Sequence, residues 1–328
     1  MFKQITLFSF LAMSLFGSDV EQCTHLLHRT SFGVSNLSLS SCLESKTYAS
    51  FVQKMIDDSH EVDSNLSTTF TTSIMRPPHK MQKPTVQERK IFRKELQQQN
   101  LALKIWWFER MLKTEKPFQE KMVLFWHNHF TSSQQKVKQP KLMYDQNQLF
   151  RKYALGNFRE FLHAMLRDPA MLIYLDNRGN KQAHPNENLA RELLELFTMG
   201  EGHYFEKDVK ELARGLTGYG LNKNFEFRFQ KKQHDFGQKS FLGVKGKLSA
   251  DDIVEIILSK EETSLFIVTK LYKEFVSYTP NAQEIQKLAK LRKLPTISST
   301  GDFIILATFV LSVKSSDVII ASIRGLSS

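Results

Sequence analysis

One face of a predicted helix near residue 190 carries the side chains best suited to chemistry. We expect this helix to run from Glu187 to Met199, with Asn188, Arg191, Glu192 and Glu195 at i, i+3, i+4 and i+7 on one side. A guanidinium beside carboxylates shifts their pKa values and can hold an anion. The same spacing also fits a solvent-facing surface with weak ion pairs. The pattern alone leaves both alternatives open.

A cleft lined by this face predicts an enzyme of the hydrolase type. In that interpretation a glutamate acts as acid, base or cation ligand, a guanidinium fixes an anion, and a histidine carries protons. The catalytic candidates are Glu192, Arg191 and His127, and the substrate-binding candidates are Asn188, Asn177 and His234. The sequence contains no GxSxG, P-loop, GxGxxG or HExxH motif, so it predicts no particular reaction.

The loop before this helix has the spacing of oxygen ligands. Asp176, Asn180 and Glu187 occupy positions one, five and twelve of a twelve-residue window, as in a calcium loop. Arg178 stands where a further ligand belongs, and Lys181 stands where the turn glycine belongs. Turn-forming hydrogen bonds are therefore the default interpretation. A divalent cation such as calcium is the alternative, and the sequence indicates no other cofactor.

Two histidine motifs give only weak evidence for a metal or binding site. On a helix His127 and His129 point about 200° apart, so they cannot grip one metal ion together. A satisfied core histidine is the alternative for either residue. His234 and Asp235 are adjacent in a predicted loop, where a turn closed by the aspartate is the alternative to a binding role.

The start of the chain is typical of an export signal. Lys3 supplies a positive charge, and a mostly apolar run from Ile5 to Phe16 precedes Gly17. The run is too short to span a bilayer, so we expect cleavage and a periplasmic or secreted protein without a transmembrane segment. An uncleaved anchor is the alternative. In an oxidising compartment Cys23 and Cys42 either pair or stay as buried thiols.

The basic charge is concentrated in one region. The formal net charge is +11, and residues Arg76 to Glu160 hold 18 Lys and Arg against 7 Asp and Glu, which accounts for the whole excess. In an exported protein this favours an anionic envelope polymer, a polysaccharide or lipid headgroups as partner, and disfavours nucleic acid. The second functional hypothesis is therefore a non-catalytic envelope protein that binds or assembles such a polymer. A solvated basic face is the plain alternative.

Hydrophobic periodicity predicts a mainly α fold. We expect a multi-helix globular bundle with a small β-hairpin or extended segment near 224–243, where Asn224 to Gln230 is the best candidate strand. The predicted divisions are a signal at 1–17, a helical segment at 18–56, a polar linker at 57–84 and a main helical domain at 85–328. A long amphipathic helix is predicted from Val86 to about Leu112, with one apolar stripe formed by Ile91, Leu101, Ile105, Phe108 and Leu112.

Periodicity and helix-breaking residues predict further helices. Pro117 suits the first turn of a helix from Phe118 to Phe130, and Gly200 closes the helix that begins at Glu187. The other predicted helices are Phe158 to Leu166, Lys207 to Leu216, Asp251 to Leu258, Thr263 to Val276 and Ala282 to Leu291, followed by two C-terminal pieces.

Several segments together resemble the bacterial family catalogued as domain of unknown function 1800. The matching runs are His25 to Gly33, Leu124 to Phe130, Tyr153 to Leu162, Arg167 to Asn177, Pro185 to Gly200, Asp208 to Tyr219 and His234 to Lys239. The resemblance implies an exported, helical protein. It assigns no reaction, so it implies no catalytic residue.

The chain also departs from the family pattern. Phe205 stands where a threonine helix cap is expected, and Tyr219 stands where the family usually has tryptophan. The Gly/Pro/Trp-rich region that normally follows is missing, while Val313 to Leu326 resembles a later family segment with altered residues. From these departures we expect a truncated or frame-disrupted member.

Overall fold

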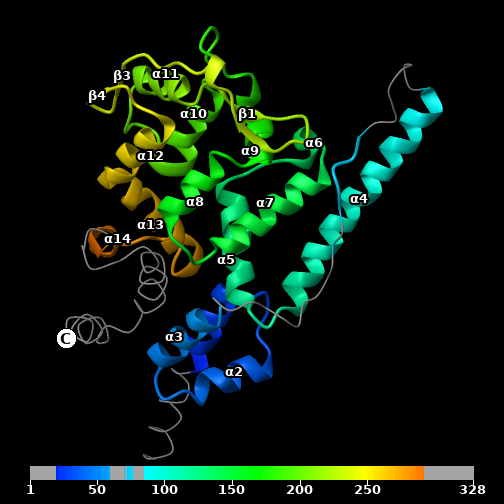
Figure 1. Cartoon of the computed structure of the whole chain (residues 1–328). Helices are drawn as coiled ribbons and strands as arrows, with labels where there is room; N and C mark the ends of the chain where they lie inside the picture. Colours follow the sequence, from blue (N-terminus) through cyan, green and yellow to red (C-terminus); the bar gives the residue numbers. More distant parts are fainter. Residues whose placement is uncertain (1–19, 60–69, 71, 77–84, 292–328) are drawn as a thin grey trace, which may run out of the picture.

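The computed structural model describes residues 20–59, 70, 72–76 and 85–291 (Figure 1). The predicted export signal, most of the predicted linker and the helical pieces predicted near the C-terminal end lie outside these residues. The described chain is mainly helical and carries two small antiparallel two-stranded sheets, which confirms the predicted fold class. The proposed domain divisions stay predictions.

Three short helices form the N-terminal end of the described chain. They are residues 20–30, α2 (Asn36–Leu43) and α3 (Tyr48–Asp58). A disulfide between Cys23 and Cys42 joins the first helix to α2, so the paired alternative is the one that the structure contains. Cross-linking residues 19 positions apart stabilises the fold by roughly 3 kcal/mol in the chain-entropy model.

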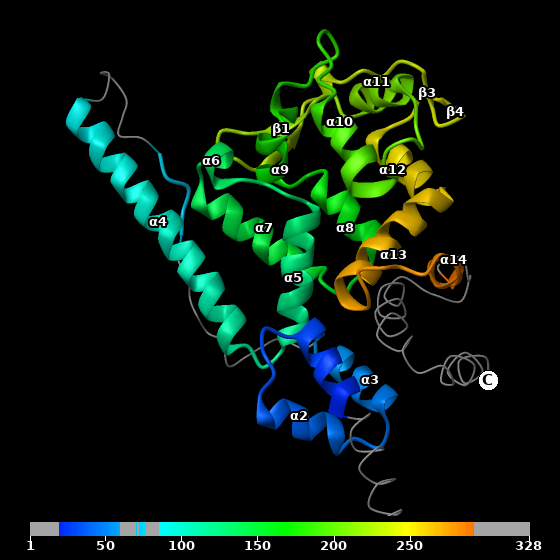
Figure 2. The ribbon, with the colours of Figure 1, turned by 180° about the vertical axis from the view of Figure 1, so that it is seen from behind.

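The long predicted helix is α4 (Val86–Lys113). Thr85 and Glu88 begin it with a reciprocal capping box, in which each side chain accepts a hydrogen bond from the other residue's backbone N–H. Figures 1 and 2 show α4 beside the rest of the protein, with its N-terminal half extending beyond the neighbouring helices. Its buried residues, Leu103, Trp106 and Arg110, lie on one face.

The opposite face of α4 carries the apolar stripe identified in the sequence. An amphipathic helix ordinarily buries such a stripe, but its five members are exposed: Ile91, Leu101, Ile105, Phe108 and Leu112. The inner face packs on α7 (Pro140–Lys152), and Leu103 and Trp106 belong to an apolar cluster that also includes residues of α7 and of α9 (Pro169–Tyr174). Helix α4 therefore has two apolar faces, and the described part of the protein covers one of them.

The main core surrounds α5 (Pro117–His129), which begins with proline in its first turn as predicted. Trp126 on α5 is fully buried, and its indole N–H donates to the Ala154 carbonyl at 3.0 Å. Phe130 and Phe161 contribute rings beside it. The neighbouring short helices are α6 (Gln134–Val137) and α8 (Phe158–Met165).

The predicted helix from Glu187 to Met199 is not uniformly α-helical. It consists of α10 (Asn188–Glu192) followed by a π-helical stretch at Leu193–Thr198, labelled η2. The Thr198 hydroxyl donates to the Leu193 carbonyl at 2.6 Å within this stretch. Gly200 then ends the helix at a φ of +83°, a left-handed conformation that favours glycine.

Two short hairpins lie in and beside the region near 224–243, where a small β-hairpin or extended segment is predicted. Strand β1 (Tyr219–Leu221) pairs with β2 (Phe227–Phe229), and β3 (Lys239–Phe241) pairs with β4 (Val244–Gly246). The predicted strand from Asn224 to Gln230 is too long, and β2 occupies only its C-terminal half.

The turn between β1 and β2 explains this correction. The Asn222 side-chain oxygen accepts hydrogen bonds from the backbone N–H groups of Asn224 and Glu226, which closes the chain before the strand begins. Alternating phenylalanines predicted extended structure correctly, but they could not show that a turn closed by Asn222 would delay the start of the strand to Phe227.

The remaining helices lie close to their predicted bounds. They are α11 (Glu206–Gly215), α12 (Ala250–Ser259), α13 (Glu261–Phe275) and α14 (Ala282–Leu291). None of the helices in the described part of the chain combines the length and the apolar content that crossing a bilayer requires.

Candidate functional site

The polar face predicted on α10 lies at the protein surface. Arg191 donates to both carboxylate oxygens of Glu206, at 2.7 and 2.9 Å, and to Glu187 at 3.2 Å. The hydrogen bond to Glu206 raises the pKa of Arg191. Asn188 is exposed, and Glu192 is partly buried, which together with the nearby Glu195 raises the pKa of Glu192. These groups form a surface ion-pair cluster.

The structure does not bring His127 to this cluster. The His127 ring lies between Trp107 and Phe150, with ring centroids 4.3 and 4.4 Å away. Its Nε2 atom is 3.0 Å from the Asn147 amide nitrogen. Burial, aided by the Arg151 charge, lowers the pKa of His127 to about 3. The imidazole is therefore neutral at physiological pH and is held between two aromatic rings, away from the α10 cluster.

His129 has a separate set of partners on the other side of α5. Its Nε2 donates to the Phe197 carbonyl at 3.0 Å, because a carbonyl oxygen only accepts. The Lys270 ammonium lies 3.2 Å from its Nδ1. Burial, followed by the Lys270 charge, lowers the pKa of His129 to about 3. The two histidines therefore share no site, as their helical spacing predicted.

Each predicted cation ligand has a protein partner. Asp176 accepts from Lys136 at 2.6 Å, and Glu187 accepts from Arg191. Asn180 is buried, and its side-chain oxygen accepts from the Asn186 backbone N–H at 2.9 Å. Among the described residues, no group of three His, Cys, Asp or Glu side chains could hold a metal ion. The cation site stays a prediction, and an ion there would have to displace these contacts.

Asn177 and Asn180 position a strand that borders a cavity. Asn177 is 1% exposed and donates to the Tyr219 carbonyl at 3.0 Å. Asn180 donates to the Asn177 side-chain oxygen at 3.0 Å and to the Ala213 carbonyl at 2.9 Å. These two buried amides tie the 176–180 loop to the end of α11 and to β1. Asn177 thus braces the cavity wall from behind.

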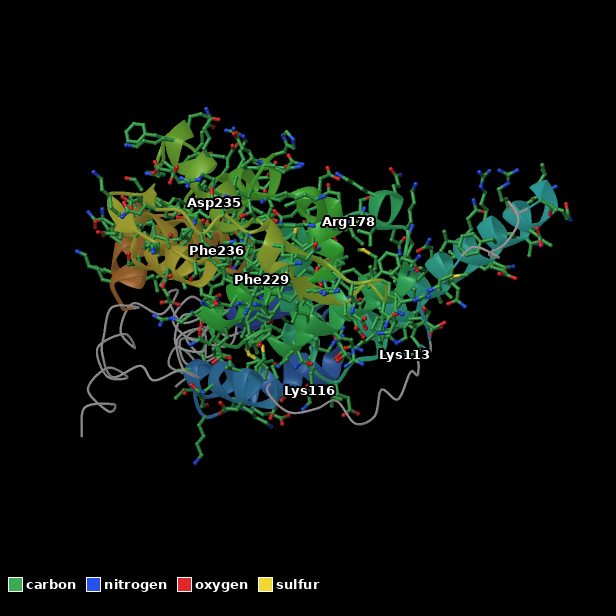
Figure 3. The ribbon with its side chains drawn as sticks, turned by 45° about the horizontal axis from the view of Figure 1, so that its top comes forward. Lys113, Lys116, Arg178, Phe229, Asp235 and Phe236 are labelled. Atoms are coloured by element: carbon green, nitrogen blue, oxygen red, sulfur yellow. A yellow bond between two sulfur atoms is a disulfide. The ribbon has the colours of Figure 1, made fainter. Side chains whose placement is uncertain are left out.

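A cavity of about 500 Å³ lies between the β1–β2 hairpin and the start of α12. Its lining combines aromatic rings with charged groups, namely Tyr219, Phe227, Phe229, Phe236, His234, Arg167, Lys239, Lys247 and Asp251. We call this the aromatic pocket. Figure 3 shows Phe229, Phe236 and Asp235 near one another on one side of the domain. Of the predicted site residues, His234 lines this pocket.

His234 is held in one tautomer. Its Nδ1 atom lies 2.7 Å from the Thr217 carbonyl oxygen, which only accepts, so Nδ1 carries the proton and Nε2 is the acceptor atom. Burial lowers the pKa of His234 and keeps the ring neutral at physiological pH. The rings of Phe229 and Phe236 lie 5.1 and 4.5 Å from it. The pocket thus contains a neutral, oriented imidazole between aromatic side chains.

Asp235 belongs to a different interaction. Its carboxylate accepts from the Arg214 guanidinium at 2.8 Å, and this hydrogen bond holds the pKa of Asp235 below its usual range.

Gly218, just before β1, allows the backbone at Gln230 to pack closely against it. At its φ of +77°, an added Cβ would lie 2.8 Å from the Gln230 carbonyl oxygen, so a side chain there would clash with backbone.

The charges of the aromatic pocket are mainly positive. Arg167 donates to Asp251 at 2.6 Å and lies about 6 Å from the centres of the Tyr219 and Phe227 rings. Lys239 is buried and donates to the Asp235 carbonyl at 2.6 Å, while burial lowers its pKa. Lys247 is exposed. Three cations face one carboxylate, so the pocket favours an anionic ligand.

The sequence indicated two parts of this pocket, but it did not indicate that they lie side by side. The alternation at Phe227 and Phe229 signalled two rings on one face of a strand, and the motif at His234 signalled a polar loop. Arg167 and Lys247 carried no signal, because each is an isolated cation in its own segment. Only the tertiary fold brings the α8–α9 turn, the β1–β2 hairpin and the start of α12 together around one pocket.

Fold and site together define a mainly helical, disulfide-linked protein with a basic aromatic pocket. Residues 25–293 match the family described as a protein of unknown function (DUF1800), and the chain belongs to this family. Searches of curated proteins and of solved structures returned no match.

Proposed function

We propose that this protein is an extracytoplasmic binding protein whose aromatic pocket takes an anionic sugar unit of an envelope polymer. The observation that carries the proposal is the pocket lining, in which four aromatic rings stand beside three cations and one carboxylate. Flat aromatic faces suit the apolar faces of sugar rings. The surplus of positive charge suits a carboxylate, sulfate or phosphate substituent.

Exposure decides which side chains make contact first. Phe236 and Lys247 are exposed, so they can meet a ligand without rearrangement. Arg167 is occupied by Asp251, and Lys239 is occupied by backbone carbonyls. We therefore assign stacking to Phe236 and anion pairing to Lys247, while the two other cations contribute a positive field.

The location outside the cytoplasm has separate support. The Cys23–Cys42 disulfide is the kind of bond that persists in oxidising compartments. The predicted export signal agrees with it. An envelope polymer would then be the anionic ligand available to the pocket.

Calorimetric titration with an acidic and a neutral oligosaccharide of equal length tests the proposal. We expect oligogalacturonate to bind at least about tenfold more tightly than a maltooligosaccharide, with affinity that falls as salt rises. Phe236→Ala and Lys247→Ala should each weaken binding about tenfold or more. The matched controls are Phe205→Ala and Lys245→Ala, which remove exposed side chains that do not line the pocket. Equal binding of both sugars, or no effect of the pocket variants, would refute the proposal.

A hydrolase is the second candidate, and one observation favours it. The fixed tautomer of His234 leaves Nε2 able to accept a proton from water, which is what a general base does. Release of reducing ends from the acidic oligosaccharide, lost in His234→Gln, would support this candidate. The catalytic roles assigned to Glu192, Arg191 and His127 stay predictions, and none of these residues lines the pocket. The basic region from Arg76 to Glu160 likewise stays a predicted binding surface.

A further inference from the structure

The outer face of α4 is an apolar strip on the protein surface. Leu101, Ile105, Phe108 and Leu112 are 58%, 50%, 62% and 65% exposed. Their spacing of four, three and four residues places them along one line of the helix. Folded proteins seldom leave such a continuous row of large apolar side chains in water. The outer face therefore has the character of an interface.

The position of α4 leaves room for a partner. Leu103, Trp106 and Arg110 face the body of the protein, and the apolar strip points away from it. Figures 1 and 2 show the N-terminal half of α4 extending past the other helices. If a second α4 helix packed along the strip, each protein body would lie on the side of its own helix that faces away from the contact.

The strip follows a seven-residue repeat. With Ile105 and Leu112 at the a position and Leu101 and Phe108 at the d position, the repeat extends back to Ile91 at a. Between Ile91 and Leu101, the a and d positions of the repeat are polar, namely Lys94 at d and Gln98 at a. The tightest packing should therefore lie in the C-terminal half of α4, and the polar residues would restrict the register.

The charges beside the strip are separated by sign. In the same repeat, Lys90 and Lys104 fall at g, on one flank, while Glu95 and Glu109 fall at e, on the other. All four have side chains at the surface, and Glu109 lies 3.6 Å from Lys113 of its own helix. The apolar strip therefore has positive charges along one side and negative charges along the other.

This separation selects the occupant and its direction. In a parallel pair of identical helices, each g residue meets the e residue five positions further along the other helix. Lys90 would meet Glu95 of the second copy, and Lys104 would meet Glu109 of the second copy. An antiparallel pair would place lysine flank against lysine flank. An anionic membrane would repel the glutamate flank.

We propose that the outer face of α4 is a homodimer interface, in which the α4 helices of two copies pack in parallel as a short coiled coil. Ile105, Phe108 and Leu112 form its apolar centre, and the two Lys–Glu pairs fix the orientation. The proposal is independent of the aromatic pocket, which lies on other elements.

Sedimentation equilibrium of the purified protein tests the association. We expect a dimer at micromolar concentrations and at least about tenfold weaker dimerisation for Phe108→Glu. The matched control is Leu37→Glu, because Leu37 is also highly exposed but belongs to a different helix, α2; it should leave the dimer intact. Circular dichroism should show the same folded state for both variants, since each changes a surface side chain. A wild-type monomer up to about 100 µM would overturn the proposal. So would a dimer that Phe108→Glu leaves unchanged, or a wild-type monomer that binds phosphatidylglycerol vesicles through this face.

Two further variants test the direction of the helices. In parallel packing the d residues of the two copies face each other, so Leu101→Cys should cross-link two chains under mild oxidation. Arg93→Cys, exposed on the same helix but away from the seam, should not. Lys104→Glu should weaken the dimer, and Lys104→Glu combined with Glu109→Lys should restore it. Cross-linking by Arg93→Cys in place of Leu101→Cys, or no restoration in the double variant, would contradict the parallel arrangement.

Discussion

Two arginine–glutamate clusters in this protein have the same chemistry and opposite surroundings. On α5, Glu120 is fully buried and accepts from Arg110 at 2.7 Å and from Arg151 at 2.6 and 2.9 Å. On α10, Arg191 pairs with Glu206 at similar distances, but both side chains are well exposed to water. Water screens the second cluster and does not reach the first.

This difference shows that a dense polar motif does not indicate burial. The segment around Arg191 has many polar side chains close together in the sequence, and the structure places it at the surface. Glu120 belonged to no recognisable motif, and the structure places it between two guanidinium groups in the interior. Burial pushes its pKa upward, but the hydrogen bonds and charges of Arg151 and Arg110 outweigh that effect and hold the pKa of Glu120 below its usual range.

The largest effect should come from Glu120→Gln. The substitution leaves two buried guanidinium groups without their carboxylate, and breaking a buried pair in this way costs about 3–5 kcal/mol. Urea unfolding at pH 7 measures the loss. Glu206→Gln, which removes the exposed carboxylate of the other cluster, serves as control and should leave the midpoint almost unchanged. Equal losses for the two variants would erase the distinction between the clusters.

A smaller effect should appear as a pH dependence carried by Asp168. This carboxyl is buried, caps α9 by accepting from the Met171 N–H at 2.7 Å, and accepts from Gln146 at 2.7 Å. Burial raises its pKa from 3.8 to about 7. Because the folded pKa is the higher one, the stabilisation is full below pH 3.8 and is lost as the pH rises through 7. The total change should be on the order of a few kcal/mol.

Asp168→Asn isolates this contribution, because asparagine keeps the cap and does not titrate. Unfolding free energies of both proteins should be measured from pH 4 to pH 7. The wild type should lose stability relative to the variant as the pH rises. His127 and His129 act in the opposite direction, since their lowered pKa values destabilise the fold as the pH falls below 6.5. Subtraction of the variant cancels their effect, and a constant difference would contradict the assignment.

Arg191→Ala should change stability by less than about 1 kcal/mol, as is usual for exposed pairs. The change should shrink further when salt is added. A thermal melt at low and high ionic strength measures both quantities. A loss as large as that of Glu120→Gln would mean that the α10 cluster is shielded from water in the molecule as it exists in solution, for example by a ligand or a partner.

The smallest effect concerns the predicted cation. Elemental analysis of the purified protein and of Glu187→Gln tests it directly. If the partners seen in the structure for Asp176, Asn180 and Glu187 persist, calcium should leave the melting temperatures of both proteins unchanged. A calcium-dependent rise in the wild type that is absent in the variant would instead establish the ion at this loop.

Much of the fold was readable from the sequence. Periodicity located α4, α5, α8, α12 and α14 closely, and Pro117 and Gly200 correctly marked a helix start and a helix end. The family resemblance is confirmed over most of the chain. These features depend on local backbone preference and on residues near one another in sequence, so local patterns are sufficient.

The site depended on tertiary structure. Periodicity shows which side chains share a face, but it does not show what that face meets. It therefore left the α10 face open between a cleft and a solvent-facing surface, and it did not predict the exposure of the outer strip of α4. The aromatic pocket joins Arg167, His234 and Lys247 from three separate segments. Burial, and with it the neutral state of His127 and the high pKa of Asp168, arises only when distant helices exclude water.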